Sequence, residues 1–198
     1  MVIEMELFPA LEIGLFNGWI LLAILVLTEL LMFTVYPRDV ASRLTDFDRS
    51  KWTKRQRVSF ATGKTFSLIC IVLIVFTPLR LGTLGLFLGG IIFCAGLMVL
   101  IAAVHTFRHA PKDKPATTGP YQFSRHPQQI GLFLIINGIA VAVGSWAIVL
   151  VEIISRTLTS AGDRAEEQAC LEYYGDSYRK YMEQVPRYLL FGGKSKGT

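Results

Sequence analysis

The chain has few of the cysteines that stabilise small secreted domains, and a smaller share of charged residues than soluble domains usually have. It has three cysteines among 198 residues, Cys70, Cys94 and Cys170. Cys70 and Cys94 lie inside apolar runs, which argues against a disulfide framework. Charged residues make up 18% of the chain and hydrophobic residues 52%, with a mean hydropathy of +0.45. This balance is too apolar for an ordinary soluble domain of this size.

Motifs of several soluble enzyme classes are also absent. No glycine-rich phosphate loop follows a strand pattern, and no serine nucleophile elbow is present. The first apolar run is preceded by no Lys or Arg and followed by no small-residue cleavage site, so it is not a cleavable signal peptide. The net charge of +5 does not indicate nucleic acid as a partner, because the basic residues lie beside hydrophobic segments, where they set membrane topology.

Long apolar runs are what the chain has in abundance. Three of them, at about 13–36, 58–79 and 81–107, are long enough for membrane-spanning helices. A helix needs roughly 20 residues to cross a bilayer core about 30 Å thick. These runs therefore predict an all-α, polytopic integral membrane protein, folded as a single domain over residues 1–198.

A fourth apolar stretch is too long for one ordinary span, and Gly144-Ser145 lies near its middle. A tight helical hairpin at that point gives two shorter helices, at about 130–143 and 145–158, and so five transmembrane helices in total. The alternative is a single long helix that absorbs the mismatch by tilting.

Basic residues alternate between the connecting segments. The segments after the first, third and fifth predicted helices are rich in Lys and Arg. The N-terminal segment, the link between the second and third helices, and the hairpin turn contain only Arg80 between them. By the positive-inside rule, the N-terminus lies outside and the C-terminal helical segment lies on the cytosolic side. Four spans would instead put the basic C-terminal tail outside.

Two polar blocks flank the last apolar stretch. Arg125-His126-Pro127 stands at the mouth of the fourth predicted helix, and Glu166-Glu167 begins a block that runs to Val185-Pro186-Arg187. Ionisable residues held at a membrane boundary are costly and are functional by default. Since both blocks are predicted on the same side of the bilayer, we expect one shared site, on the cytosolic side, within a catalytic part at about 110–191.

Local signals predict how the second block folds. Glu166-Glu167 begins an amphipathic stretch that stops at Gly175, and Asp176 can then cap a short helix ending before Pro186. Arg164 and Glu167 are three apart and can share one helix face. An interfacial amphipathic helix without chemistry is the alternative reading of this block.

Two further patterns favour structure over chemistry. His105 and His109 share one helix face, but a metal site needs more ligands, so we expect no metal. The pairs Gly85-Gly89 and Gly138-Ala142 have small-x-x-x-small spacing and predict close helix packing. The polar segment 110–119 is interpreted as a connector rather than a lid.

A set of short motifs occurs in order over roughly the last 80 residues. They are Gly119-Pro120-Tyr121, Arg125-His126-Pro127, Gly131, Gly138, Glu166-Glu167, Tyr174-Gly175, Tyr178, Tyr181 and Val185-Pro186. This pattern resembles the isoprenylcysteine carboxyl methyltransferases, and most closely their small, archaeal-type members with five membrane helices. Phospholipid methyltransferases and the C-terminal parts of sterol reductases share related motifs.

The resemblance implies an integral membrane enzyme that uses S-adenosylmethionine without a Rossmann domain. It implies that His126 and Glu167 lie at the cofactor site. Tyr121 and Tyr178 are candidates to flank the adenine or the sulfonium, and Gly119 belongs to the same candidate cofactor-binding set. Where the family usually has an aromatic residue after the His-Pro step, this chain has Gln128 and Gln129, a departure that bears on the acceptor more than on the cofactor.

The acceptor that the resemblance implies is the carboxylate of a C-terminal isoprenylated cysteine, which would enter sideways from the bilayer. A carboxylate is ionised at pH 7 and needs no general base, so catalysis rests on alignment and partial desolvation. Arg125 is the first candidate to hold that carboxylate by a bidentate pair, and Arg164 the second.

Other functions stay open at this point. The acceptor can be another lipid or small hydrophobic molecule, and a phospholipid amine would need deprotonation and hence a base. A nicotinamide-dependent reductase relative and a non-catalytic membrane scaffold are further alternatives. Binding of S-adenosylhomocysteine separates the methyltransferases from both, since a reductase binds a nicotinamide dinucleotide and a scaffold binds neither.

Overall fold

The computed structural model describes residues 5–35, 52–111 and 113–188. Within these residues the chain forms six α-helices and no β-strand, which confirms the all-α prediction. The helices are α1 (Trp19–Val35), α3 (Lys54–Phe76), α4 (Leu84–His109), α5 (Pro127–Val143), α6 (Trp146–Tyr174) and α7 (Asp176–Gln184), with a short 3-10 helix, η1 (Gly119–Gln122), between α4 and α5.

Two of these helices, α3 and α4, are long and apolar enough to cross a membrane by length and composition. Helices α1 and α5 are apolar but shorter. The first predicted span, 13–36, is corrected at its start, because α1 begins only at Trp19. The Asn17 side chain donates to the carbonyls of Glu12 and Val75, at 2.7 and 3.2 Å, and holds the preceding residues in a non-helical path. Residue 36 lies outside the described residues.

The next two predicted spans shift by a few residues. Helix α3 covers Lys54–Phe76 rather than 58–79, because Thr53 and Gln56 form a capping box at its start and Pro78 follows its end. Helix α4 covers Leu84–His109 rather than 81–107, with the Thr83 side chain accepting from the Leu86 N–H at its start.

The helical hairpin is confirmed. Helix α5 ends at Val143, Gly144 has a φ of 70°, and the Ser145 side chain caps α6. A positive φ suits glycine, which has no Cβ to clash. The single tilted helix considered from the sequence is therefore wrong.

The two arms of this hairpin differ from the predicted ranges. Helix α5 begins at Pro127 rather than 130. Helix α6 runs without interruption over Trp146–Tyr174 rather than 145–158, so Glu166-Glu167 lies inside it and does not begin a new element. Gly175 ends α6 as expected, but Asp176 is the first residue of α7, and no side chain caps that helix.

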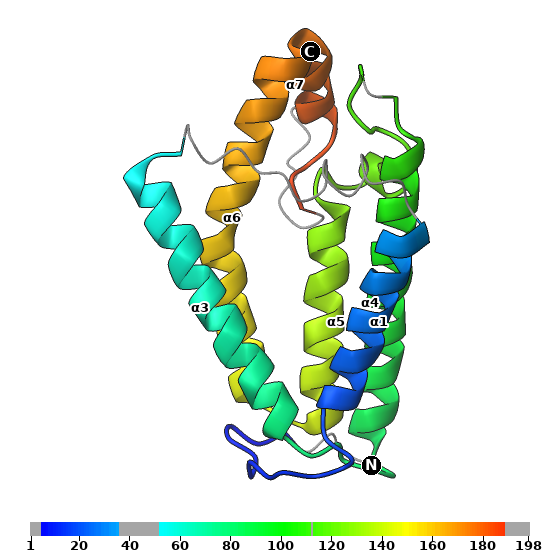
Figure 1. The fold of residues 1–198 in the computed structure, drawn as a ribbon, viewed down its shortest axis with the longest axis vertical. Helices are drawn as coiled ribbons and strands as arrows, with labels where there is room; N and C mark the ends of the chain where they lie inside the picture. The colour runs from blue at the N-terminus through cyan, green and yellow to red at the C-terminus, as the bar shows by residue number, and fades with distance from the viewer. Residues whose placement is uncertain (1–4, 36–51, 112, 189–198) are drawn as a thin grey trace.

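The chain places its connections at two opposite ends of the bundle (Figure 1). At one end, the Glu6 N–H donates to Gly144 O and the Trp146 N–H donates to Glu6 O, both at 2.9 Å. The Glu6 carboxylate also pairs with Arg80 at 2.6 Å. Helix α7 and the segment with η1 lie at the other end (Figure 1). The two polar blocks therefore lie at the end away from residues 5–18.

Helices α4 and α5 pack backbone to backbone. A Cβ on Gly89 would lie 2.5 Å from Gly138 O, and one on Gly131 would lie 2.9 Å from Leu100 N. The small-residue spacing therefore serves close packing, as predicted. Beside this contact, Ile135 and Ile139 are fully buried and anchor the main apolar core.

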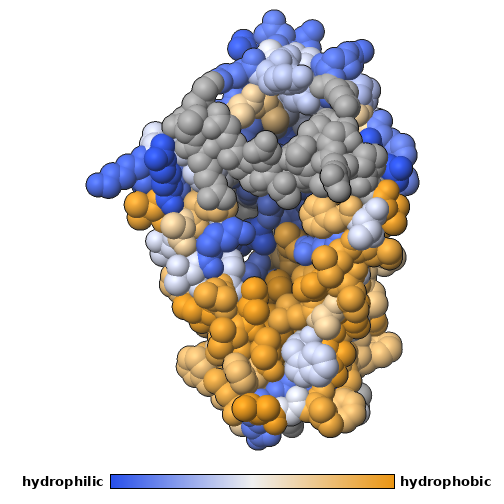
Figure 2. Space-filling view, in the orientation of Figure 1, coloured by the Kyte–Doolittle hydropathy of each residue, from blue (hydrophilic) through white to orange (hydrophobic). Residues whose placement is uncertain are grey.

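On the face shown in Figure 2, the surface is mostly hydrophobic from the middle of the bundle to its lower end and hydrophilic at its upper end. Large apolar side chains are exposed on three helices: Leu27, Leu30 and Leu31 on α1, Leu68, Ile69 and Val72 on α3, and Phe87, Ile91 and Met98 on α4. An exposed apolar band of this extent is expected where lipid replaces water around the protein.

Candidate functional site

The site begins where the chain enters α5. Pro127 occupies the first helical position, where its missing N–H costs nothing, and His126 is the residue before it. Ser124 holds this approach: its hydroxyl accepts from the His126 N–H at 3.1 Å and donates to Arg187 O at 2.7 Å. The Arg125 N–H donates to Pro186 O at 3.0 Å. The segment after α7 is thus tied to the mouth of α5.

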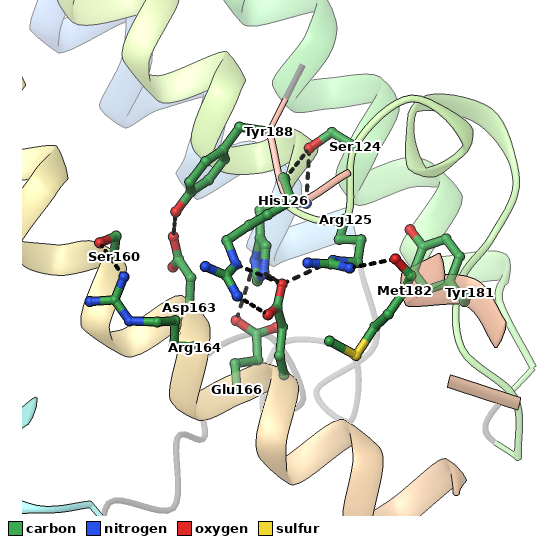
Figure 3. A network of polar contacts seen from close by, with 12 residues as sticks. Ser124, Arg125, His126, Ser160, Asp163, Arg164, Glu166, Tyr181, Met182 and Tyr188 are labelled. Atoms are coloured by element: carbon green, nitrogen blue, oxygen red, sulfur yellow. Dashed lines mark hydrogen bonds and ion pairs between the residues drawn. The ribbon is translucent and has the colours of Figure 1, made fainter. Parts of the chain in front are cut away.

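Glu167 of α6 is the centre of the site. Its Oε1 accepts from Arg125 Nε at 3.0 Å and from Arg187 Nε at 2.9 Å, and it lies 3.2 Å from His126 Nε2. Arg187 also reaches the second carboxylate oxygen, which makes its pair with Glu167 bidentate. The Glu167 side chain is only 3% exposed. Figure 3 shows Arg125 and His126 turned toward this polar face of α6.

The charges around Glu167 shift the pKa values of the group. Burial alone would raise the Glu167 pKa, but hydrogen bonds from His126 and Arg187 and the charges of Arg125 and Arg187 lower it to about 2. For His126, burial lowers the pKa, but the hydrogen bond to Glu167 and the charges of Glu166, Asp163 and Glu167 outweigh it and raise the pKa. The centre therefore favours an ionised carboxylate beside an imidazolium.

Glu166 differs from its neighbour although it is the next residue on α6. Its side chain is 41% exposed, and its Oε2 lies 3.8 Å from His126 Nδ1. Partial burial and the charges of Asp163 and Glu167 raise its pKa, while His126 acts in the opposite direction. The site thus presents one carboxylate saturated by cations and one that is partly open.

Three tyrosines, one from η1 and two from α7, form an apolar support. Tyr121, Tyr178 and Tyr181 are buried together with Ala103 and Val185. The Tyr181 hydroxyl donates to Tyr121 O at 2.8 Å, and the Tyr178 and Tyr181 rings pack edge to face. Burial raises the pKa values of all three phenols, so they stay neutral. The predicted contacts of Tyr121 and Tyr178 with a cofactor stay predictions.

Gly119 has a clear local role at the start of η1. Its φ is 54°, and a Cβ there would lie 2.7 Å from Thr106 Oγ1. Glycine is therefore required where the loop turns back against α4. Its predicted place in the cofactor set stays a prediction.

The two arginines considered for the acceptor have different surroundings. Arg125 is 8% exposed and is engaged by Glu167 and by the Met182 carbonyl, the latter at 3.0 Å. Arg164 is exposed, and it donates to the Ser160 hydroxyl at 3.3 Å. Figure 3 shows Arg164 beside Ser160, turned away from Arg125. The structure therefore brings Arg125 to Glu167, but not Arg164, although Arg164 and Glu167 are only three residues apart.

Two residues of the site, Asp163 and Tyr188, were not singled out from the sequence, and Arg187 was named only as the end of the second polar block. The Tyr188 hydroxyl donates to Asp163 Oδ2, and the Tyr188 and His126 ring centroids are 6.1 Å apart. Asp163 lies one turn before Glu167, so helical spacing could have found it. Arg187 stands in the Val185-Pro186-Arg187 step, where only its contact with Glu167 reveals its role.

His126, Asp163 and Glu166 could together hold a metal ion by spacing, since one ligand atom from each lies within 4.8 Å of the others. A metal needs a neutral imidazole nitrogen, whereas the raised pKa of His126 favours the protonated ring. The Tyr188 hydroxyl also occupies Asp163. A metal at this donor set would have to displace the proton of His126, and the expectation of no metal stays a prediction.

Comparison with known protein families gives a match over most of the helical bundle. A family model described as phospholipid methyltransferase matches residues 58–177, which is more than half of the chain. The matched region runs from α3 to the start of α7 and contains Arg125, His126 and Glu167. No curated protein and no solved structure matches the chain.

Proposed function

The chain belongs to the phospholipid methyltransferase family, which makes it a membrane methyltransferase for lipid-type substrates, and we propose that it transfers a methyl group from S-adenosylmethionine to the carboxylate of an isoprenylated cysteine. The observation that carries the proposal is the Glu167 centre, in which cations and carboxylates of three segments meet at one end of an apolar bundle. A charged cofactor from water and an apolar acceptor from lipid meet at such a boundary.

The residues present fit the amino-acid part of S-adenosylmethionine, which carries both an ammonium and a carboxylate. Glu166 offers a partly open carboxylate for the ammonium, and Arg187, which is 30% exposed, offers a guanidinium for the carboxylate. Glu167 and His126 hold these two groups in place through the charge network. When bound, the cofactor supplies an electrophilic methyl group on a sulfonium.

A carboxylate acceptor is favoured because the two buried groups at this centre, Glu167 and His126, are poor bases. Glu167 has a pKa of about 2, which makes it a poor base, and His126 favours its protonated form. A carboxylate acceptor needs neither, because it is already ionised. One of its oxygens forms the new O–C bond as the S–C bond breaks, which leaves a methyl ester and a neutral thioether and moves no proton.

A phospholipid amine is the second candidate acceptor, favoured by the family match and by Glu166. An ammonium must lose a proton before it can attack a methyl group. Of Glu166 and Glu167, Glu166 is the better base because its pKa is raised. The two acceptors give products that differ in stability, because a methyl ester is hydrolysed by alkali whereas an N-methyl group is not.

The test uses the purified full chain with methyl-labelled S-adenosylmethionine. We expect S-adenosylhomocysteine to bind and an S-farnesylcysteine derivative to receive alkali-labile label. Alkali-stable label on phosphatidylethanolamine would favour the second candidate. Binding of a nicotinamide dinucleotide, with no binding of S-adenosylhomocysteine, would overturn both.

We infer further that α1, α3, α4, α5 and the first half of α6 cross the bilayer, with the Glu167 centre on the cytosolic side. The basic residues near that end and the basic-poor turns at the other support this topology. In a background without native cysteines, single cysteines near Glu6 and Gly144 should react with an impermeant label from outside. Labelling from outside near Lys54 would contradict the five-span topology.

A further inference from the structure

A second polar cluster lies inside the apolar part of the bundle, away from the Glu167 centre. Arg156 of α6 donates through its NH1 to Gln129 Oε1 of α5 and through its NH2 to Glu152 Oε1 at 3.3 Å. Glu152 is 4% exposed. Ionisable side chains are rare in such segments and mark ligand sites or proton paths by default. The cluster therefore needs an explanation of its own.

The positive charges at this cluster outnumber the negative ones. The positive charge of Lys64 on α3 also acts on Glu152. Lys64 and Arg156 against Glu152 leave one excess positive charge in this part of the bundle. Arg156 Nε is buried and has no hydrogen-bond partner among the described residues. A buried guanidinium N–H without an acceptor is costly, so this atom favours a ligand that offers an acceptor.

The cluster is partly open, since the Arg156 side chain is 25% exposed while that of Glu152 is 5% exposed. Helix α3 packs closely on α6 but has few contacts with α1 and α5. Figure 2 shows a hollow on this face, with hydrophobic walls and hydrophilic residues at its floor, and Figure 1 in the same orientation shows the diverging helices α3 and α1 on either side of it. A lipid chain can lie in such a hollow while its polar group reaches the floor.

The same helix face leads from the cluster to the Glu167 centre. Arg156 and Asp163 are seven residues apart, which is two turns and about 10 Å along α6. The charge of Arg156 reaches Tyr188, whose hydroxyl donates to Asp163. A group bound at Arg156 thus lies close enough to His126 and Glu167 for one small molecule to reach both.

We propose that Arg156 and Gln129 bind the anionic group of the lipid acceptor in this groove. The ligand is a lipid with one negative charge, a prenylcysteine carboxylate or a phospholipid phosphodiester, and the inference rests on the proposed methyltransferase function. Arg125 and Arg187 pair with Glu167, and Arg187 is also assigned to the cofactor carboxylate. Arg164 points away, so Arg156 is the candidate for the acceptor among these four arginines. A purely structural pairing with Glu152 would not leave Arg156 Nε unmet.

The test compares paired ligands that differ only in charge. Binding to the purified full chain is measured for S-farnesylcysteine and its neutral carboxamide, and for a short-chain phosphatidylethanolamine and the matching diacylglycerol. Wild-type protein should prefer the anionic member of one pair. Arg156→Gln should reduce that preference by about tenfold to a hundredfold, while S-adenosylhomocysteine affinity stays unchanged.

A second variant separates a loss of ligand binding from misfolding of the single variant. Arg156→Gln alone leaves Glu152 without its partner, so the double variant Glu152→Gln, Arg156→Gln removes both charges together. It should lose the preference to the same extent, and Gln129→Leu should lose part of it. Arg179→Gln is the matched control, since Arg179 is 69% exposed on α7 and pairs only weakly with Asp176.

The outcomes separate this inference from the function on which it rests. No charge preference in wild-type protein, or a preference that survives both the single and the double variant, overturns the role of Arg156. Methyl transfer that continues with an unchanged preference in these variants overturns Arg156 alone and leaves the function standing. An Arg156-dependent preference without methyl transfer supports the lipid site and overturns the enzyme. The pair that shows the preference identifies the anion.

Discussion

Helix α5 is held by two different kinds of contact. Along its length it packs closely against α4, and at its start it is tied to the polar end around Glu167 by charged groups. Along the α4–α5 contact, glycines let the two backbones approach closely. A Cβ added at Gly96 would lie 2.7 Å from Ile135 N. At the polar end, three cations converge on Glu167 from the mouth of α5 and the segment after α7. The α4–α5 contact depends on close fit, so an added side-chain atom disrupts it. The polar end depends on charge pairing, so the loss of one charged group disrupts it.

This difference matches the surroundings of each region. Within lipid there is little hydrophobic drive between helices, so close van der Waals contact carries the association. At the boundary with water, charged groups can be solvated in part and can also bind a ligand. The rigid α4–α5 pair thus fixes where Arg125 and His126 stand, and the charge network decides what they can bind.

The largest effect should come from removing the shared anion of the polar end. Glu167→Gln leaves Arg125 buried without its partner, and breaking such a pair costs about 3–5 kcal/mol. S-adenosylhomocysteine affinity and the protease resistance of the segment after α7 should both fall sharply.

The matched control for that change is Glu183→Gln, which removes an exposed carboxylate from α7. It should leave ligand affinity and protease resistance as in wild type. Equal behaviour of the two variants would mean that the charge network does not hold the polar end.

The next largest effect should come from the α4–α5 contact. A Cβ on Gly89 meets backbone atoms of α5 at 2.5 Å, whereas one on the neighbouring Gly90 meets nothing within 4 Å. Gly89→Ala should therefore destabilise the fold by about 1–3 kcal/mol, as overpacking does, and Gly90→Ala should not. Thermal unfolding in detergent measures both, and similar unfolding temperatures would show that the contact can relax.

A smaller effect should appear as pH dependence at the polar end. The His126 pKa is raised above its ordinary 6.5, so its stabilising charge is fully present below pH 6.5 and is lost as the pH rises through the raised value. Glu167, with a pKa of about 2, stays ionised throughout this window.

The stability of the wild-type protein should therefore fall above pH 6.5, by at most about 1.4 kcal/mol per pH unit. Unfolding followed between pH 6 and 9 checks this, with His126→Gln as the comparison. The slope should be absent in that variant, and an equal slope in both proteins would assign the titration to another group.

The smallest effect concerns the tyrosine support beneath the polar end. Tyr181→Phe removes one buried hydrogen bond, to Tyr121 O, and should cost about 0.5–1.5 kcal/mol. Tyr173→Phe is the control, because Tyr173 is 73% exposed. Thermal unfolding should separate the two variants, and equal stability would show that the Tyr181–Tyr121 hydrogen bond makes no net contribution.

Much of the fold follows from local patterns in the sequence. Apolar length predicted the helices, and Gly144-Ser145 predicted the hairpin, because a helix stop and a cap are decided within a few residues. The continuity of α6 was missed for the opposite reason. Its apolar first half and charged second half look like separate elements, and only burial against α3 and α5 keeps them in one helix.

The site was predictable in its parts but not in its pairings. The sequence by itself determined that Arg125, His126 and Glu167 belong to one polar end, because their two blocks flank a hairpin of known length. Only the tertiary structure decided that Arg125 and Arg187 share Glu167, that Arg164 turns away, and that Arg156 meets Gln129. These contacts join residues 20 to 42 positions apart, and they depend on the rotation and tilt of packed helices. Each residue turns an α-helix by about 100°, so a small change in packing exchanges the side chain that faces the site for its neighbour.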